Sequence, residues 1–355
     1  MRFMSRTFHL ACALLLATVA TPLHAAKADR ILIVVSGEGR DQGKTRPGYE
    51  FDELSQAWLI FQANGFAIDV ASPQGGAVEA DRYDPQQPFN AALLADTEAT
   101  RMLAATRRTD QVKAEDYAAI YVVGGKGAMF DLPRDTALTT LLGDAYARGA
   151  VIGAVCHGPA ALAEVRLRDG TPLVQGKALT GFTNEEEAVF GKRWVKEFPW
   201  LLEDRMRARG AQWQEAPLMM AKVVVDGRLV TGQNPYSTPG VADAIIRATG
   251  RTPVARTPWR DELTMGLAAQ VRAGDVGAAI VQPSMRCRRA LASAMSGLPA
   301  STCRTSDLAC SRSPRRRCAS AAPSLNSGCG MYGNASGISC RAWRTSSSRV
   351  AACAW

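Results

Sequence analysis

The sequence predicts an α/β protein built as a three-layer sandwich, in which a mostly parallel β-sheet lies between two layers of helices. Between Lys27 and about Gly250, strand-like and helix-like stretches alternate. The strand-like stretches, such as "RILIVV" at 30–35, are continuous apolar and β-branched runs, which are typical of strands buried on both faces. The helix-like stretches, such as "FDELSQAWLIFQANG" at 51–65, carry apolar residues at helical spacing and end on glycine. This alternation implies a parallel sheet that is covered on both sides.

Each element follows from its own local pattern. Apolar and β-branched runs predict strands over 30–37, 66–73, 117–125, 151–156 and 177–182, and a hairpin over 221–232 that turns at Asp226-Gly227. Helical spacing predicts helices over 51–65, 91–94, 97–106, 136–150, 158–165, 185–190, 199–209 and 238–250. We place one α/β domain over 27–250 and a C-terminal extension, with room for one further helix, over 251–284.

The first 26 residues are typical of an export signal. Arg2 and Arg6 precede the apolar stretch "LACALLLATVA", which is too short to span a bilayer, and "PLHAA" offers a cleavage site after Ala25 or Ala26. No later stretch is apolar for long enough to cross a membrane. We therefore expect a periplasmic or secreted protein that does not associate with a membrane once the signal is removed.

Positive charge is concentrated in the segment 285–355. The chain has a formal net charge of +9, but this segment alone carries +10, from eleven Arg and one acid, Asp307. The other 284 residues therefore carry a net charge of −1. A nearly neutral domain gives no reason to expect a nucleic-acid partner. The segment also lacks the apolar periodicity of a packed domain. We interpret it as disordered or as the wrong reading frame of a GC-rich gene, and we prefer the second interpretation.

The cysteines give no pattern of metal ligands. Seven of the nine lie in the segment 285–355, with no C-x-x-C pair and no histidine nearby, so a zinc site is not expected there. A disulfide scaffold would suit an exported protein, but the segment offers little for such bridges to hold together. We expect neither a metal nor an organic cofactor.

The loop after the first strand resembles a phosphate-binding loop without completing its motif. "GEGRDQGKT" ends like G-x-x-x-x-G-K-[ST], but Glu38 stands where the motif needs its first glycine. Arg46-Pro47-Gly48 then follows where the helix should already be running. A nucleotide-binding function is therefore not favoured.

Cys156 and His157 are the strongest candidates for chemistry. The thiol ends a strand and enters a predicted helix through Gly158-Pro159, as the nucleophile does at the elbow of serine hydrolases. A helix N-terminus favours the thiolate and lowers the thiol pKa. The alternatives are a buried apolar cysteine and a solvent-facing histidine in a turn. The backbone N–H groups of His157, Gly124 and Gly125 could form an oxyanion hole.

Two groups of carboxylates follow strands and could complete such a site. Glu50, Asp52 and Glu53 begin the first helix, whereas Glu185, Glu186 and Glu187 follow "LTGFTN". Acids at helix starts often only complement the helix dipole, so the sequence chemistry leaves the choice among them open.

Together these residues resemble the DJ/PfpI superfamily of class I glutamine amidotransferase-like proteins, over roughly Ala28–Gly250. The motifs that carry the resemblance include "YVVGG", "AVCHGPAAL", "LTGFTNEEE" and "GRLVTGQNPYS". The stretches "KTRPGYEFDELSQAW" and "GFTNEEE" look like the heat-shock chaperone/glyoxalase III branch. The resemblance implies a flavodoxin-like fold of the class I glutamine amidotransferase-like type.

The resemblance also implies roles for the candidate residues. Cys156 would be the nucleophile and His157 its dyad partner. Glu53 would be the buried glutamate beside the thiol, and Glu187 the acid that orients the histidine, with Glu186 as its alternative. This branch usually has a histidine where Lys126 stands, so no role of that imidazole is carried over, although a cation there could still favour thiolate.

The function that the resemblance implies is a cofactor-free, glyoxalase III-like conversion of small α-oxoaldehydes, such as methylglyoxal, to 2-hydroxy acids. The alternatives are a stress chaperone or holdase, a cysteine amidohydrolase or aminopeptidase, and a thiol redox sensor. The expected partner is a small aldehyde substrate, and a homodimer is left open.

Overall fold

The computed structural model describes residues 29–274, 343–345 and 348–350. The predicted signal peptide and most of the segment 285–355 therefore lie outside the described residues. The chain divides into two units, 1–298 and 299–355. The second unit contributes one antiparallel hairpin, formed by β10 (Trp343–Thr345) and β11 (Ser348–Val350). Across the described residues, no helix is both long and apolar enough to span a bilayer.

The first unit is organised around a seven-stranded sheet in the order β3-β2-β1-β4-β5-β9-β8. Its strands are β1 (Arg30–Val34), β2 (Ala67–Ser72), β3 (Arg107–Arg108), β4 (Ala119–Val122), β5 (Val151–Val155), β8 (Val223–Asp226) and β9 (Leu229–Gly232). All neighbouring pairs are parallel except β8 with β9, which form the predicted antiparallel hairpin. The central strands β4 and β5 are buried along their whole length, because helices cover both faces.

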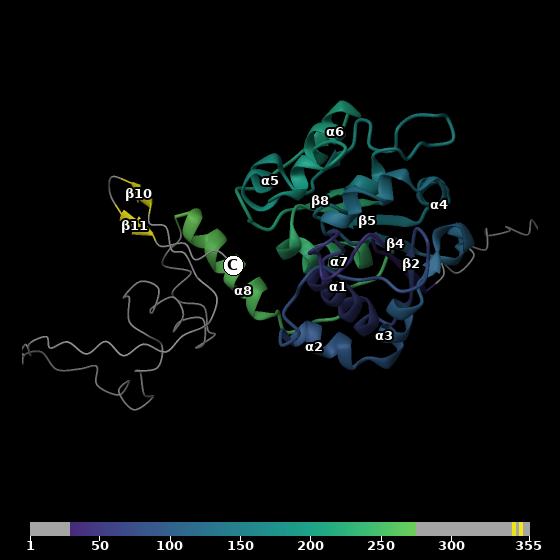
Figure 1. The fold of residues 1–355 in the computed structure, drawn as a ribbon, viewed down its shortest axis with the longest axis horizontal. Helices are drawn as coiled ribbons and strands as arrows, with labels where there is room; N and C mark the ends of the chain where they lie inside the picture. The colour runs from purple at the N-terminus through teal and green to yellow at the C-terminus, as the bar shows by residue number, and fades with distance from the viewer. Residues whose placement is uncertain (1–28, 275–342, 346–347, 351–355) are drawn as a thin grey trace, which may run out of the picture. The chain divides into compact units, whose positions relative to one another are not determined.

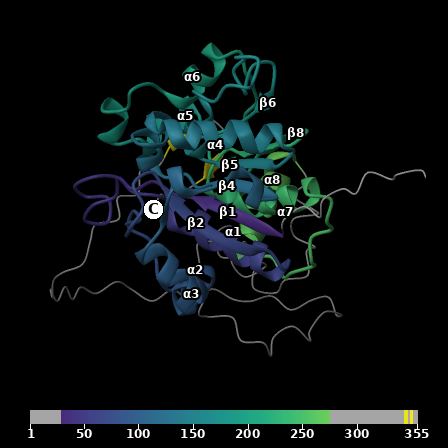
Figure 2. The ribbon, with the colours of Figure 1, turned by 90° about the vertical axis from the view of Figure 1, so that its right-hand side faces the viewer.

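Helices pack on both faces of this sheet. Figures 1 and 2 show α4 (Thr136–Ala147) on one face, and α1 (Phe51–Ala63) with α7 (Thr238–Ala248) on the other. The pair α2 (Pro88–Ala95) and α3 (Thr97–Ala104) follows β2, and α8 (Arg260–Arg272) lies in the extension after α7. The predicted three-layer α/β fold with a mostly parallel sheet is thus confirmed.

A smaller substructure lies between β5 and β8 in the chain and carries one of the site residues. It contains α5 (Asn184–Phe190), α6 (Leu202–Ala208) and a two-stranded sheet of β6 (Ala178–Leu179) with β7 (Gln212–Trp213). In Figure 1, α5 and α6 lie close together at one end of the unit. The strand predicted over 177–182 is therefore only two residues long and does not join the main sheet.

A second prediction was wrong at the segment after Cys156. The helix expected over 158–165 is a five-residue 3₁₀ helix, Gly158–Leu162. The 3₁₀ helix ends at Leu162, and Val165 beyond it accepts a backbone N–H from Leu173. The short β3 and β7 were not predicted, because two-residue strands carry no detectable alternation.

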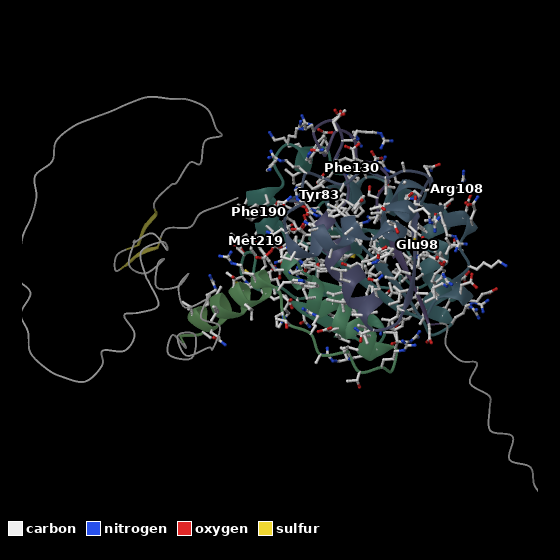
Figure 3. All side chains as sticks on the ribbon, turned by 90° about the horizontal axis from the view of Figure 1, so that it is seen from below. Tyr83, Glu98, Arg108, Phe130, Phe190 and Met219 are labelled. Carbon is white, nitrogen blue, oxygen red and sulfur yellow. The ribbon has the colours of Figure 1, made fainter. Side chains whose placement is uncertain are left out.

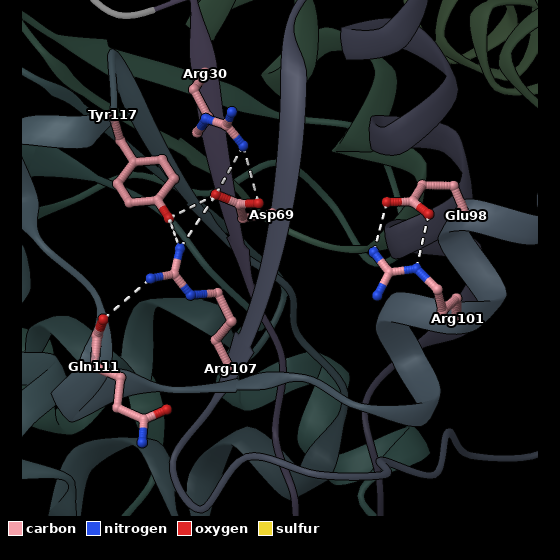
Figure 4. Close-up of polar contacts among 7 residues, drawn as sticks. All are labelled: Arg30, Asp69, Glu98, Arg101, Arg107, Gln111 and Tyr117. Atoms are coloured by element: carbon pink, nitrogen blue, oxygen red, sulfur yellow. Dashed lines mark hydrogen bonds and ion pairs between the residues drawn. The ribbon is translucent and has the colours of Figure 1, made fainter.

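The edge of the sheet at which the parallel strands begin is held by a polar network (Figure 4). Asp69 on β2 accepts hydrogen bonds from Arg30 on β1, at 3.0 Å, and from the hydroxyl of Tyr117 before β4, at 2.8 Å. Arg107 on β3 donates to the Tyr117 hydroxyl at 2.9 Å. These contacts connect β1, β2, β3 and the segment before β4 at the end of the sheet where the parallel strands begin. Parallel sheets place their sites at the opposite end, beyond the carboxyl ends of the strands.

Candidate active site

Cys156 lies immediately after β5 on a sharp turn at the carboxyl edge of the sheet. Its φ is +57°, a left-handed conformation that non-glycine residues adopt rarely and that costs free energy. Two backbone hydrogen bonds hold the turn: Cys156 N–H donates to the Gly232 carbonyl at 2.9 Å, and Phe182 N–H donates to the Cys156 carbonyl at 2.8 Å. The strained turn directs the thiol out of the strand, as at a nucleophile elbow.

His157 contacts the sulfur directly and is held from its other side by Glu187. Its Nδ1 lies 3.2 Å from Sγ of Cys156, and its Nε2 lies 2.7 Å from Oε1 of Glu187. A carboxylate only accepts hydrogen bonds, so Nε2 must be the donor in this pair. Nδ1 then presents a lone pair to the thiol and can accept its proton.

The imidazole ring is also fixed by aromatic packing. It is stacked on Phe182 with centroids 4.5 Å apart, and it packs edge-on against Phe198 at 5.9 Å. Phe130, labelled in Figure 3, extends this aromatic wall by packing edge-on against Phe198. His157 is therefore buried and has little freedom to rotate.

The structure separates the roles of Glu186 and Glu187, which the sequence left open. Glu186 is fully buried, and its carboxylate accepts hydrogen bonds from Thr183, Met219, Gln233 and Asn234 instead of bonding His157. With Thr183 it forms a capping box at the start of α5. Glu186 thus anchors the helix, and Glu187, one position further, reaches the histidine.

Glu53 approaches the thiol from α1. Its side chain is fully buried, and its Oε2 accepts the backbone N–H of Gly124 at 2.6 Å. Its Oε1 is buried without a hydrogen-bond partner among the described residues. Burial, together with the nearby Glu50 charge, raises the pKa of Glu53 well above its usual range. The raised pKa favours the protonated carboxyl, and Oε1 is the oxygen left to carry the proton because Oε2 accepts the Gly124 N–H.

The thiol does not have the low pKa that the sequence led us to expect. Burial is the main cause that raises the pKa of Cys156; Glu53 adds to the rise when it is ionised, and the Gly125 N–H opposes it. The expectation relied on a helix dipole, but only a short 3₁₀ helix follows the thiol. The resting site therefore holds a protonated thiol that needs a base, and His157 is in contact with it.

The predicted oxyanion hole needs one correction. The N–H of Gly124 is taken by Glu53, so it is not a free donor for a substrate oxygen. A Cβ at Gly124 would lie 2.7 Å from both Cys156 Cβ and Glu53 Oε2, so glycine is needed there for close approach. Gly125 instead directs its N–H toward the sulfur, where it can bind an oxygen on the adjacent carbon.

Charged groups at the mouth of the site come from two loops. Lys126 begins the turn Lys126–Met129; burial raises the pKa of Asp81, and the charge of Lys126 opposes this rise at Asp81 and at Glu50. Burial nevertheless raises the pKa of Glu50 to about 8. Asp52, which shares the first turn of α1, instead bonds Asn90 at 2.6 Å and faces α2.

Access to the sulfur is narrow. Cys156 is only 4% exposed. A cavity of about 510 Å³ lies along neighbouring loops between Gly37 and Asp131, but Cys156 does not line it. Within the described residues, no group of three or more His, Cys, Asp or Glu side chains has an arrangement that could hold a metal ion.

The fold and this arrangement define an α/β protein with a cysteine on a nucleophile elbow, a histidine in contact with the sulfur, and two buried glutamates. The sequence signature of the DJ-1/PfpI family matches residues 45–248, and the chain belongs to this family.

Its relatives include named glyoxalases. The chain is 35% identical over 216 residues to the glutathione-independent glyoxalase HSP31 of Saccharomyces cerevisiae, which covers 55% of this chain and 86% of the relative. It is 30% identical over 226 residues to the glutathione-independent glyoxalase hsp3101 of Schizosaccharomyces pombe, which covers 57% of this chain and 87% of the relative. A crystal structure of glyoxalase III from Candida albicans matches with a TM-score of 0.57 at 26% identity, covering 62% of this chain and 96% of that one.

Proposed function

We propose that this protein is a glutathione-independent glyoxalase that converts small α-oxoaldehydes, such as methylglyoxal, to 2-hydroxy acids. The observation that carries the proposal is a buried Cys156 thiol in contact with the His157 imidazole and hydrogen-bonded to the carboxyl of Glu53, whose pKa burial raises. The similarity to named glyoxalases supports the same reaction. In this site the Cys156 thiol takes the place of the thiol that glutathione would supply.

The first step forms a carbon–sulfur bond. His157 Nδ1 accepts the proton of the thiol, and the sulfur attacks the aldehyde carbon of the substrate. The Gly125 N–H binds the oxygen that becomes negative, and Oε1 of Glu53 transfers its proton to it. The product is a hemithioacetal, with a proton held on His157 and a negative charge on Glu53.

The second step moves a hydrogen between the two substrate carbons. The Glu53 carboxylate removes the C–H proton beside sulfur, which gives an enediol, and returns that proton to the neighbouring carbon. His157 protonates the oxygen on that neighbouring carbon, and Glu53 recovers the proton that it lent to the first oxygen. One carbon is oxidised and the other reduced, so no electron carrier takes part.

The last step is hydrolysis of the resulting thioester. Water adds to the carbonyl carbon with His157 as base, the carbon–sulfur bond breaks, and the sulfur recovers its proton. The products are the 2-hydroxy acid and the free thiol.

The direct test is turnover of methylglyoxal without glutathione, followed by proton NMR in D₂O. We expect lactate, with deuterium at carbon 2 to the extent that the Glu53 proton exchanges with solvent. Absence of lactate, with loss of methylglyoxal only into protein adducts, would contradict the proposal.

A chaperone role is the main alternative. A holdase would suppress aggregation of an unfolded client equally well with Cys156→Ala, whereas the enzyme would lose turnover. If the cysteine variant protects a client protein and the wild type makes no lactate, the chaperone is the better account.

We further propose that the protein is exported, because Arg2 and Arg6 precede an apolar stretch and a small-residue cleavage site. Sequencing the N-terminus of protein recovered from a periplasmic or culture fraction tests this: a start after Ala25 or Ala26 is expected, and an intact Met1 in the cytoplasm would contradict it. Whether the chain forms a homodimer, which the sequence leaves open, is tested by measuring the molar mass of the purified chain by light scattering.

A further inference from the structure

The end of α5 packs against Glu187, the carboxylate that contacts His157. Phe190, labelled in Figure 3, is the last residue of α5, and Gly191 follows it as the C-cap. The N–H of Gly191 donates to the Glu187 carbonyl at 2.8 Å. Its Cα faces the Glu187 carboxylate, since a Cβ built there would lie 2.7 Å from Oε2.

Oε2 is the oxygen of Glu187 that does not bond His157. It is buried and has no hydrogen-bond partner among the described residues. The carboxylate is therefore bonded on one oxygen and closely packed on the other. Any group that pushes on Oε2 must also move Oε1, which lies 2.7 Å from Nε2 of His157.

The backbone at Gly191 does not itself require glycine. Its φ of −62° and ψ of −29° are ordinary helical values that any residue adopts. The reason for glycine here is space: a Cβ would also lie 2.6 Å from the Glu187 carbonyl oxygen and 2.9 Å from Cβ of Val195. These distances are shorter than van der Waals contact, so a side chain would displace its neighbours.

We propose that Gly191 is a positioning residue for catalysis, whose missing side chain leaves the space that keeps Glu187 in line with His157. Glu186 anchors the start of α5, and Gly191 leaves room at its end, so that Glu187, the carboxylate of α5 that contacts His157, keeps its position. The kinetic consequence rests on the proposed function, whereas the effect on the His157 tautomer does not.

The test is a double-mutant cycle between positions 191 and 187 in the full chain. Gly191→Ala should lower kcat on methylglyoxal by about tenfold to a hundredfold, the scale expected for a misplacement of less than 1 Å to about 1 Å. In a Glu187→Ala background the carboxylate is gone, so the added methyl should cost less than about twofold. Equal losses on both backgrounds would overturn the proposal, because the effect would then arise from the Val195 and backbone contacts.

A second measurement reports the geometry without activity. Imidazole ¹⁵N shifts, with His157 assigned by its loss in His157→Gln, should show the Nε2–H tautomer in wild type. Gly191→Ala should give the same mixture of tautomers as Glu187→Ala. A cooperative melting transition would show that the Gly191→Ala variant is folded. Wild-type shifts in Gly191→Ala would overturn the proposal even if activity fell. If the wild type shows no glyoxalase activity, these shifts still decide the role of Gly191.

Gly266→Ala is the matched control. Gly266 is a helical glycine in α8, and a Cβ there would meet nothing within 4 Å. It should therefore leave kcat and the imidazole shifts unchanged.

Discussion

Nε2 of His157 lies 2.7 Å from Oε1 of Glu187, and each of the two side chains is 2% exposed. This contact fixes the histidine tautomer that faces the thiol, because the carboxylate can only accept. The sequence separates the two residues by 30 positions, and the small α5 substructure brings them together.

The Glu187→Gln variant should lose turnover with little loss of stability. The amide can donate to Nε2, which would place the proton on Nδ1 and remove the base from the sulfur. We expect kcat to fall about a hundredfold or more, in keeping with the cost of a wrong histidine tautomer in hydrolases. Steady-state kinetics and a thermal melt check this, and a kcat within twofold of wild type would contradict the assigned orientation.

The Glu186→Gln variant should show the opposite pattern. Glu186 accepts hydrogen bonds from Thr183, Met219, Gln233 and Asn234 in a buried network, and the amide would place an N–H₂ group against such donors. We expect a loss of about 2–4 kcal/mol in the free energy of unfolding, since buried donors lose their partners. Urea unfolding measures it; a stability equal to that of wild type would mean that the network does not anchor α5.

The Glu53→Gln variant should lose turnover by about two to four orders of magnitude, the usual range for a general base. It should also melt at a higher temperature than wild type, by a margin that grows with pH. The pKa of Glu53 is higher in the folded than in the unfolded protein. The stability that the protonated Glu53 contributes is therefore fully present below the unfolded pKa of about 4.3 and is lost as the pH rises through the folded pKa. Glutamine stays neutral, so the variant does not lose stability in this way. Melting curves from about pH 4 to pH 8 check the trend; a constant difference would show that Glu53 ionises normally.

Thiol labelling tests the electrostatics of the site. The pKa of Cys156 is raised by burial and by the charges of Glu53 and Glu50, so iodoacetamide labelling should have a midpoint above the free value of about 8.5. Glu50→Gln removes one of these charges and should move the midpoint to lower pH. A wild-type midpoint below about 7 would show that the helix-terminus argument from the sequence was correct after all.

The sequence predicted the sheet and most helices because buried strands and amphipathic helices leave periodic patterns. "RILIVV" and "VIGAVC" became β1 and β5, and Asp226-Gly227 turns the hairpin as expected. It could not predict that the segment after Cys156 would stop as a 3₁₀ helix, because good helix formers, "AALAE", follow Gly158-Pro159. In the structure the chain turns back after this helix, and Leu173 N–H donates to the Val165 carbonyl.

Within the site, local sequence could identify Cys156 but not its electrostatics. Burial of the thiol beside Glu53 depends on the first turn of α1, which lies at the carboxyl ends of the strands and is more than 100 residues away in sequence. The use of the Gly124 N–H by Glu53 likewise depends on a contact across 71 positions. The role of Gly191 carries no local signal, because its backbone conformation is ordinary.

The most direct test of the central claim compares wild type with Cys156→Ala in a glutathione-free methylglyoxal assay, together with intact-protein mass spectrometry during turnover. The account predicts that wild type forms lactate and carries a transient adduct with the mass of one methylglyoxal, and that the variant does neither while keeping its melting temperature. Lactate formation by Cys156→Ala at a rate comparable to wild type would contradict the account.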